Sequence, residues 1–237
     1  MTVLQALPTR LRLARLGYVT APQDSLSDWE QLCRGLYGAG VDIILIRQRR
    51  SDRASDLAAA TAAAQRAAQG RGRLVGLSAP KPPDFAVDLL YLATRDRLAP
   101  PPDRFPLTGR PAETLTEAAE QATDPAAAFF TVGPVQAEEE TSPARGLALV
   151  RAAARLAPVA DLDRPPWFAT GGVLAANLDA VLEAGARRLI VHRAIAEAAD
   201  PLAEARRLAD RLRQAWLGDP SLTAYARAVR AADGAAT

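Results

Sequence analysis

Residues 166–173 read Pro-Trp-Phe-Ala-Thr-Gly-Gly-Val, and residues 188–195 read Arg-Leu-Ile-Val-His-Arg-Ala-Ile. Each stretch is an apolar run that ends in residues suited to an anion. Paired glycines after a strand let backbone N–H groups approach a phosphate closely, and barrel enzymes often bind phosphate after their seventh and eighth strands. We therefore expect Gly171, Gly172, His192 and Arg193 to bind phosphate. A glycine pair that serves only the backbone shape is the alternative.

Working outward from these stretches, short apolar runs and helical patterns alternate along the chain, which is typical of parallel β/α units. We expect eight strands, at 16–20, 42–46, 74–77, 89–92, 105–108, 128–132, 167–170 and 188–191. Expected helices cover 27–37, 53–68, 112–122, 144–156, 177–183 and 201–216. No GxGxxG motif follows the first strand, which disfavours a doubly wound sheet. The chain of 237 residues therefore fits one α/β domain, a (β/α)8 TIM barrel.

Prolines mark the irregular parts of this barrel. They fill the connections after strands three and four, where we expect extended chain and few helical residues. Ser27, with Glu30 three residues later, predicts a capping box at the first expected helix. A break at 218–220 precedes an amphipathic stretch at 221–232. We expect residues 1–217 to form the barrel and residues 218–237 to form an extra C-terminal helix.

The composition is that of a soluble globular protein, with 49% apolar and 24% charged residues and a net charge of +2. The basic residues are scattered and do not alternate with aromatic ones, so we expect no nucleic-acid partner. No run of about twenty apolar residues occurs, which predicts no membrane span. The one cysteine, Cys33, cannot form an internal disulfide. These features predict a cytoplasmic protein.

The second expected strand carries two arginines beyond its apolar core. Alternate residues of a strand share a face, so Arg47 and Arg49 are expected to continue the inward face into the mouth and form a fork for phosphate oxygens. A solvated basic turn is the alternative. His192 is the only histidine, and a cluster of histidines or thiolates is therefore excluded. Any metal would be Mg²⁺ held by carboxylates and shared with a phosphate.

Four ordered motifs resemble the thiamine phosphate synthase/TenI family, from about residue 16 to residue 216. They are similar to GVxxxQLRxK at 40–49, GvGPVf at 130–135, FAIGGI…N at 168–173 with Asn177, and aGAxgvavvsAI at 184–195. In that family the synthase joins a pyrimidine pyrophosphate to a thiazole phosphate. Pyrophosphate leaves through a carbocation-like transition state.

The resemblance implies roles for individual residues of this chain. Gly171, Gly172, His192 and Arg193 would occupy the thiazole-phosphate site. The catalytic positions would be Arg47, which matches the pyrophosphate-binding arginine, and Arg49, which stands where the family has lysine. Asp96 matches a carboxylate that binds Mg²⁺.

Several family positions carry other residues here. Leu45 stands for the glutamine of QLRxK, and residues 77–78 read Leu-Ser where the family has Asn-Asp. Residues 109–113 lack the serine and histidine of GxSxH, and residues 139–142 lack the lysine of a Thr-Lys pair. The motifs therefore favour a barrel that binds a small phosphorylated, thiazole-type metabolite. An active synthase with substitute residues, a non-catalytic regulatory or partner subunit, and assembly into a homo-oligomer stay open.

Overall fold

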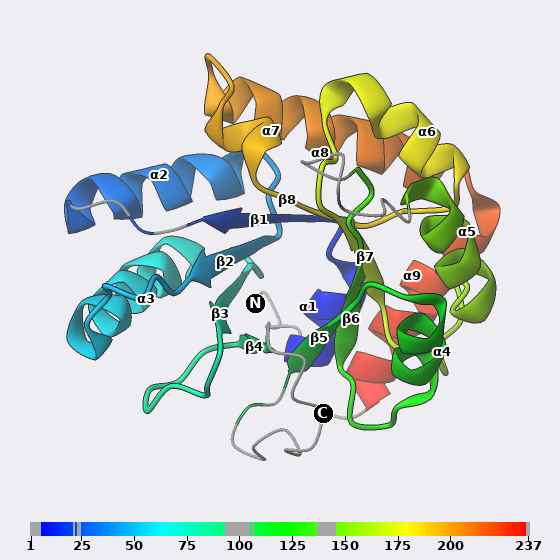
Figure 1. Cartoon of the computed structure of the whole chain (residues 1–237), viewed down its shortest axis with the longest axis horizontal. Helices are drawn as coiled ribbons and strands as arrows, with labels where there is room; N and C mark the ends of the chain where they lie inside the picture. The colour runs from blue at the N-terminus through cyan, green and yellow to red at the C-terminus, as the bar shows by residue number, and fades with distance from the viewer. Residues whose placement is uncertain are drawn as a thin grey trace.

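The computed structural model describes residues 6–20, 22, 25–92, 105, 107–136 and 146–235. Its strands pair in parallel and in chain order, and β8 closes the ring against β1 (Figure 1). The strands are β1 (Leu16–Thr20), β2 (Ile43–Arg47), β3 (Leu74–Ala79), β4 (Leu89–Leu92), β5 (Thr108–Ala112), β6 (Phe129–Val132), β7 (Trp167–Thr170) and β8 (Leu189–Val191). The predicted (β/α)8 TIM barrel is confirmed.

Helices surround the barrel and close one of its ends. They are α1 (Leu7–Leu13), α2 (Leu26–Gly38), α3 (Ala54–Ala68), α4 (Leu115–Thr123), α5 (Gly146–Leu156), a 3₁₀ turn η1 (Ala175–Asn177), α6 (Leu178–Glu183), α7 (Arg193–Ala196), α8 (Pro201–Leu217) and α9 (Pro220–Ala235). Residues 80–88, between β3 and β4, contain no helix, as predicted. The proline-rich stretch after β4 falls mostly outside the described residues. Among the described helices, none combines the length and apolar character of a membrane span.

The fifth strand lies further along the chain than the sequence predicted. The apolar pattern suggested 105–108, whereas β5 runs from Thr108 to Ala112 and includes a glycine and a proline. A Cβ atom at Gly109 would lie 2.3 Å from the ring of Phe129. The glycine therefore makes room for a large side chain from the neighbouring strand, and this long-range packing overrides the local apolar pattern.

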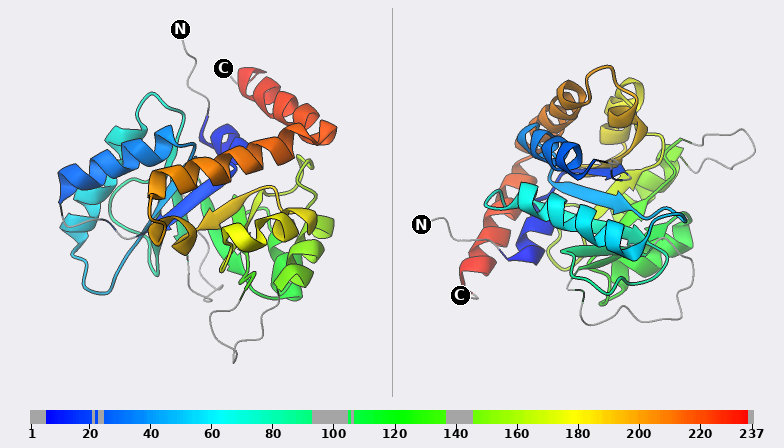
Figure 2. Two further views of the ribbon diagram at one scale, coloured as in Figure 1. Left: turned by 90° about the horizontal axis from the view of Figure 1, so that it is seen from above. Right: turned by 90° about the vertical axis from the view of Figure 1, so that its left-hand side faces the viewer.

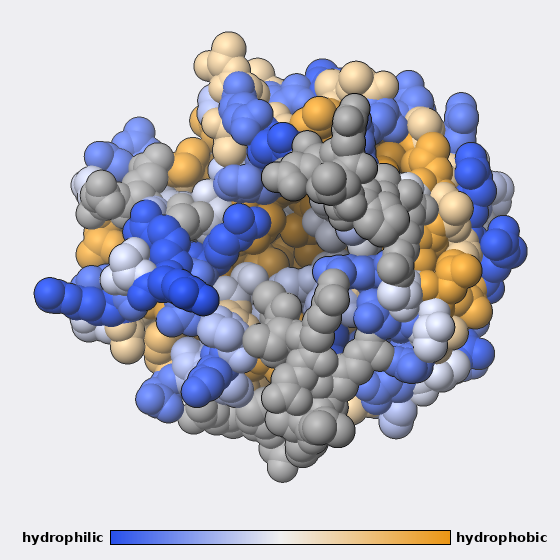
Figure 3. All heavy atoms as spheres, in the orientation of Figure 1, coloured by the Kyte–Doolittle hydropathy of each residue, from blue (hydrophilic) through white to orange (hydrophobic). Residues whose placement is uncertain are grey.

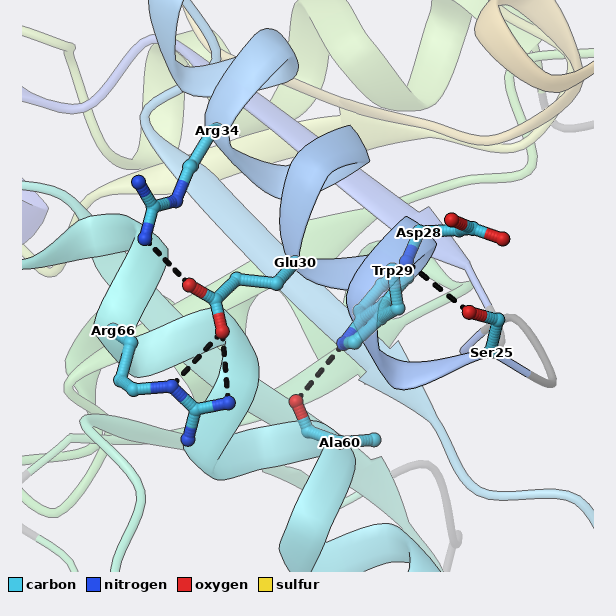
Figure 4. Close-up of polar contacts among 7 residues, drawn as sticks. All are labelled: Ser25, Asp28, Trp29, Glu30, Arg34, Ala60 and Arg66. Carbon is cyan, nitrogen blue, oxygen red and sulfur yellow. Dashed lines mark hydrogen bonds and ion pairs between the residues drawn. The ribbon is translucent and has the colours of Figure 1, made fainter.

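The contact between α2 and α3 corrects the predicted capping box. Ser25, and not Ser27, caps α2 by accepting a hydrogen bond from the N–H of Asp28 at 3.3 Å. Glu30 does not reach back to the helix start, because it pairs with Arg34 on its own helix and Arg66 on α3 (Figure 4). Trp29 is fully buried, and its Nε1 donates to the Ala60 carbonyl at 2.9 Å. These contacts fix α3 against α2 on the outside of the barrel.

The barrel interior is packed with apolar side chains and sealed at the N-terminal end. Leu11 and Ala14, on and just after α1, join the interior cluster of the strands. Helix α9 lies beside α1 and packs on α8, at the end of the barrel opposite the mouth (Figure 2). The backbone N–H of Ala6 donates to the Asp233 carboxylate near the end of α9. Access from this end is therefore closed, and the site has to lie at the other end.

Candidate ligand site at the barrel mouth

The C-terminal end of the barrel holds two adjoining compartments. One, of about 320 Å³, lies against the ends of β7 and β8, and we call it the polar compartment. The other, of about 410 Å³, lies over the middle of the barrel, and we call it the central compartment. Both are lined by Val19, Arg47 and Thr170, which therefore form their boundary. Figure 3 shows the hollow in this face, with apolar surface inside it and hydrophilic residues along part of its rim.

The loop after β7 needs glycine at two successive positions. Gly171 and Gly172 have φ values of 76° and 79°, in the left-handed region that other residues rarely adopt. A Cβ atom at Gly171 would lie 2.8 Å from the Cα of Pro134, and one at Gly172 would lie 2.5 Å from the carbonyl oxygen of Gln136. The loop after β6 therefore presses directly on this turn, and the glycines have a structural role beside any role in binding.

This turn presents backbone donors to the polar compartment. The N–H groups of Gly172 and Val173 donate to no acceptor among the described residues, and both residues line the compartment. Asn177 holds the turn in place: its Nδ2 donates to the Gly172 carbonyl at 2.8 Å, and its Oδ1 accepts from the N–H of Leu174 at 2.9 Å. Successive free N–H groups in such a turn form a concave site for an anion.

Strand β8 ends in the two other predicted phosphate ligands. His192 and Arg193 both line the polar compartment. His192 Nδ1 lies 2.7 Å from the carbonyl oxygen of Val19. Because a carbonyl only accepts, Nδ1 carries the proton, and Nε2 is the acceptor in the neutral ring. The ring also stacks on Tyr18 at 6.3 Å between centroids, so its orientation is fixed from two sides. Glu197 lines the same compartment from the end of α7.

The two arginines of the predicted fork lie in different places. Arg47 is exposed at the end of β2 and lines both compartments. Arg49 turns away, because the following turn brings Asp52 to it: its Nε lies 2.9 Å from Asp52 Oδ1, and its N–H donates to Asp52 Oδ2 at 2.7 Å. Arg49 lines a separate cavity beside α2 and α3. The structure thus brings Arg47, and not Arg49, to the phosphate ligands.

The central compartment contains residues that the sequence did not single out. Its floor is apolar, with Val19, Leu45 and Ile190. Above the floor stand the hydroxyls of Ser78, Tyr91, Thr131 and Thr170. Each of these four is the last residue of its strand, or close to it, on the inward face, and that position was the available signal. Burial raises the pKa of Tyr91 from 10.0 to about 12, so its hydroxyl stays protonated even at alkaline pH.

Comparison with known proteins identifies the family. A family model described as thiamine monophosphate synthase matches residues 106–195. The thiamine-phosphate synthase of Acidothermus cellulolyticus is 35% identical over 84% of this chain and 95% of its own length. That of Streptomyces avermitilis is 36% identical over 87% of this chain and 97% of its own. The chain belongs to the thiamine-phosphate synthase family. The recognised motifs therefore reflect true relationship.

Solved structures of the family share the fold. Thiamine phosphate pyrophosphorylase from Pyrococcus furiosus superposes with a TM-score of 0.67 over 89% of this chain and 99% of that one, at 17% identity. The match supports the closed barrel.

The family resemblance implies Mg²⁺, and the described residues do not supply a site for it. Within the described part of the chain, no three His, Cys, Asp or Glu residues are grouped to hold a metal ion. Among the described residues that line the two compartments, Glu197 is the one carboxylate. Asp96, the predicted metal ligand, lies outside the described residues, as does the acidic run 138–140.

Proposed function

We propose that this chain is a thiamine-phosphate synthase, which joins hydroxymethylpyrimidine pyrophosphate to thiazole phosphate and releases pyrophosphate. The polar compartment carries the proposal, because it is lined by two backbone N–H groups that donate to no acceptor among the described residues, and by His192, Arg193 and Arg47. Relatives named thiamine-phosphate synthase, 35–36% identical over most of the chain, support the same reaction.

In this proposal the polar compartment binds the thiazole phosphate. The N–H groups of Gly172 and Val173 and the guanidinium of Arg193 donate to its oxygens, as charge-assisted hydrogen bonds. The ring nitrogen of the thiazole then forms a bond to the methylene carbon of the pyrimidine. The C–O bond of that methylene breaks, and pyrophosphate leaves with the electron pair. Arg47, at the boundary of the compartments, offsets the charge that develops on the leaving group.

No step is assigned to a metal ion, because the described carboxylates do not form a site for one. Mg²⁺ takes oxygen ligands in near-octahedral geometry and usually needs one or two carboxylates beside the phosphates. In the described part of the mouth, Ser78 stands where the family has the aspartate of its Asn-Asp pair, and its side chain is a neutral hydroxyl.

A second candidate is a barrel that binds the phosphorylated thiazole without turnover. Leu45 and Ser78 favour it, because they line the central compartment where the family motifs have a glutamine and an aspartate. The similarity to named synthases favours the synthase, and the substituted positions favour the barrel that binds without turnover. Both share the polar compartment as the phosphate site.

One assay separates the two functions. Purified protein is mixed with both precursors and Mg²⁺, and ³¹P NMR follows pyrophosphate and thiamine phosphate while calorimetry measures thiazole-phosphate binding. The synthase predicts that both products appear in equal amounts. Saturable binding with no product would leave the binder, and neither binding nor product would reject both.

Paired variants locate the reaction in the polar compartment. Arg193→Ala is expected to weaken thiazole-phosphate binding by about 10- to 100-fold, since a hydrogen bond from a charged group is lost. Arg47→Ala is expected to lower turnover with a smaller effect on that binding. Arg50→Ala removes an exposed positive charge three residues from Arg47, outside both linings, and serves as the matched control.

A further inference from the structure

Three arginines gather around two aromatic rings at the closed end of the barrel. Arg12 lies on α1, Arg15 just before β1, and Arg188 just before β8. The guanidinium groups of Arg15 and Arg188 lie 6.0 and 5.2 Å from the ring centre of Trp216. Those of Arg12 and Arg188 both donate to the hydroxyl of Tyr225, at 3.5 and 3.4 Å. Two cations therefore share one hydroxyl as their acceptor.

No carboxylate pairs with any of these three arginines in the part of the chain that the structure describes. The carboxylate of Asp42 lies nearby, because it accepts a hydrogen bond from the backbone N–H of Arg15 at 2.8 Å. That carboxylate is paired with Arg73. Like charges at close range repel one another, and a buried cation without a counter-ion is costly. The closed end thus holds positive charge that the described side chains do not balance.

Arg188 also has donors that no described residue accepts. Its side chain is 1% exposed, and its Nη2 donates to the Arg12 carbonyl at 2.8 Å. Nε and Nη1 are buried and have no hydrogen-bond partner among the described residues. Burial, together with the charge of Arg12, lowers the pKa of Arg188 to about 10, so the group is still a cation at neutral pH. Buried polar groups are almost always hydrogen-bonded, so these donors indicate a bound ion or water molecule.

An anion explains both features, whereas a water molecule explains only one. Water accepts a hydrogen bond from Nε or Nη1 of Arg188 but leaves its charge unbalanced. The surroundings favour a compact ion. Trp216 Nε1 donates to the Arg187 carbonyl at 2.8 Å, and the rings of Trp216 and Tyr225 contact each other edge to face at 6.2 Å between centroids. A tetrahedral oxyanion would have to move these fixed rings apart.

We propose that the closed end of the barrel binds a compact monovalent anion, such as chloride, at Nε and Nη1 of Arg188 with Arg12 beside it. The site lies at the opposite end from the mouth, and the inference does not rest on the proposed function. Because the arginines meet only in the folded chain, the anion binds the native state and stabilises it.

The first test compares sodium chloride with sodium gluconate at equal ionic strength. Both salts screen the repulsion between the arginines, but gluconate is too large for an enclosed site. Above the dissociation constant of one site, a tenfold rise in chloride should lower the unfolding equilibrium constant about tenfold. Urea denaturation in mixtures of the two salts measures this constant. Equal stability in both salts would overturn the proposal, because screening alone would then account for the effect.

A pair of variants locates the chloride effect. Arg188→Met replaces the buried cation with an apolar side chain, a type of change that folded proteins tolerate, and it should abolish the dependence on chloride. Arg71 provides the matched control, because it is an exposed arginine shortly before β3, at the same end of the barrel. Arg71→Met should keep the full dependence. A chloride effect that survives in Arg188→Met would contradict the assigned site.

Bromide locates the ion in the unmodified chain, so this readout does not depend on how any variant folds. A crystal grown in bromide should show anomalous scattering in contact with Nε or Nη1 of Arg188. A water molecule at that position, or bromide confined to exposed arginines, would overturn the proposal.

Two further comparisons fix the class of ion and keep this site distinct from the mouth. Stabilisation by inorganic phosphate but not by chloride, lost in Arg188→Met, would show an oxyanion site and reject the compact anion. Thiazole-phosphate affinity and turnover should be equal in Arg188→Met and the unmodified chain. The two proposals therefore fail separately: absence of turnover bears only on the mouth, and absence of a chloride effect bears only on the closed end.

Discussion

The two ends of the barrel hold arginine in opposite environments, exposed at the mouth and buried at the closed end. At the mouth, Arg47 is exposed and borders both compartments. At the closed end, Arg188, just before β8, is 1% exposed and has no carboxylate partner among the described residues. Its guanidinium lies 5.2 Å from the ring centre of Trp216 and 5.6 Å from that of Tyr225.

This contrast indicates that ligand binding and stability depend on opposite ends of the same barrel. A cation at the mouth stays hydrated and ready for an anion, whereas the buried one is held by aromatic faces and by a hydrogen bond of 2.8 Å to the Arg12 carbonyl. Nε and Nη1 of Arg188 have no hydrogen-bond partner among the described residues. Burial lowers the pKa of this guanidinium to about 10. In TIM barrels generally, the mouth carries function and the opposite end carries stability.

The largest expected effect comes from removing an aromatic face at the closed end. Tyr225→Ala should lower the free energy of unfolding by about 3–4 kcal/mol, because it opens a cavity and uncovers the buried charge. Tyr225→Phe keeps the ring and should cost about 1 kcal/mol. Urea denaturation measures both. Thiazole-phosphate affinity should stay within twofold, and a marked fall would show that the two ends are coupled.

The next effect compares two glycines with similar positive φ values. Gly70 and Gly172 have φ values of 71° and 79°, but a Cβ atom at Gly70 would meet nothing within 4 Å. Gly70→Ala should therefore cost about 1 kcal/mol. Gly172→Ala should cost about 2 kcal/mol or more, because Gln136 must also move, and it should weaken phosphate binding. Equal stability losses and equal phosphate affinities would contradict the proposed packing of the mouth.

The smallest effect is a pH dependence in which the two ends oppose each other. The pKa of Tyr91 is raised from 10.0 to about 12, so its contribution is complete below pH 10 and is lost as pH rises towards 12. The pKa of Arg188 is lowered from 12.5 to about 10, so its burial penalty is full below pH 10 and is relieved above it. Arg188→Met removes that relief.

Urea titrations between pH 10 and 12 test this opposition. Arg188→Met should lose stability more steeply with rising pH than the unmodified chain, and Tyr91→Phe should lose it less steeply. Identical slopes in all three proteins would mean that neither group titrates as its burial implies.

Local patterns were sufficient to predict much of the barrel. Seven strands lie within two residues of their expected positions, because each is an apolar run bounded by turn residues. Helix α1 was missed, since Arg10 and Arg12 interrupt its short apolar stripe, and only its contact with the barrel interior explains it. The displaced β5 has the same cause, a long-range contact that no local pattern contains.

The candidate site divides in the same way. The glycine pair and the end of β8 could be predicted as phosphate ligands, because each is a pair of consecutive residues with a recognisable pattern. The hydrogen bond between the Tyr91 and Thr131 hydroxyls, 2.8 Å apart, could not be predicted, since forty positions separate the two residues. The direction of Arg49 depends on the turn to Asp52, which strand alternation does not include. Neighbours in sequence were therefore predictable, and neighbours across the barrel were not.

The central claim is that the turn at Gly172 and the end of β8 form one phosphate site, and a crystal structure with thiazole phosphate tests it most directly. We predict phosphate oxygens within hydrogen-bonding distance of the N–H groups of Gly172 and Val173, with Arg193 beside them. Phosphate bound instead beside Arg49, in the cavity near α2 and α3, would contradict this assignment.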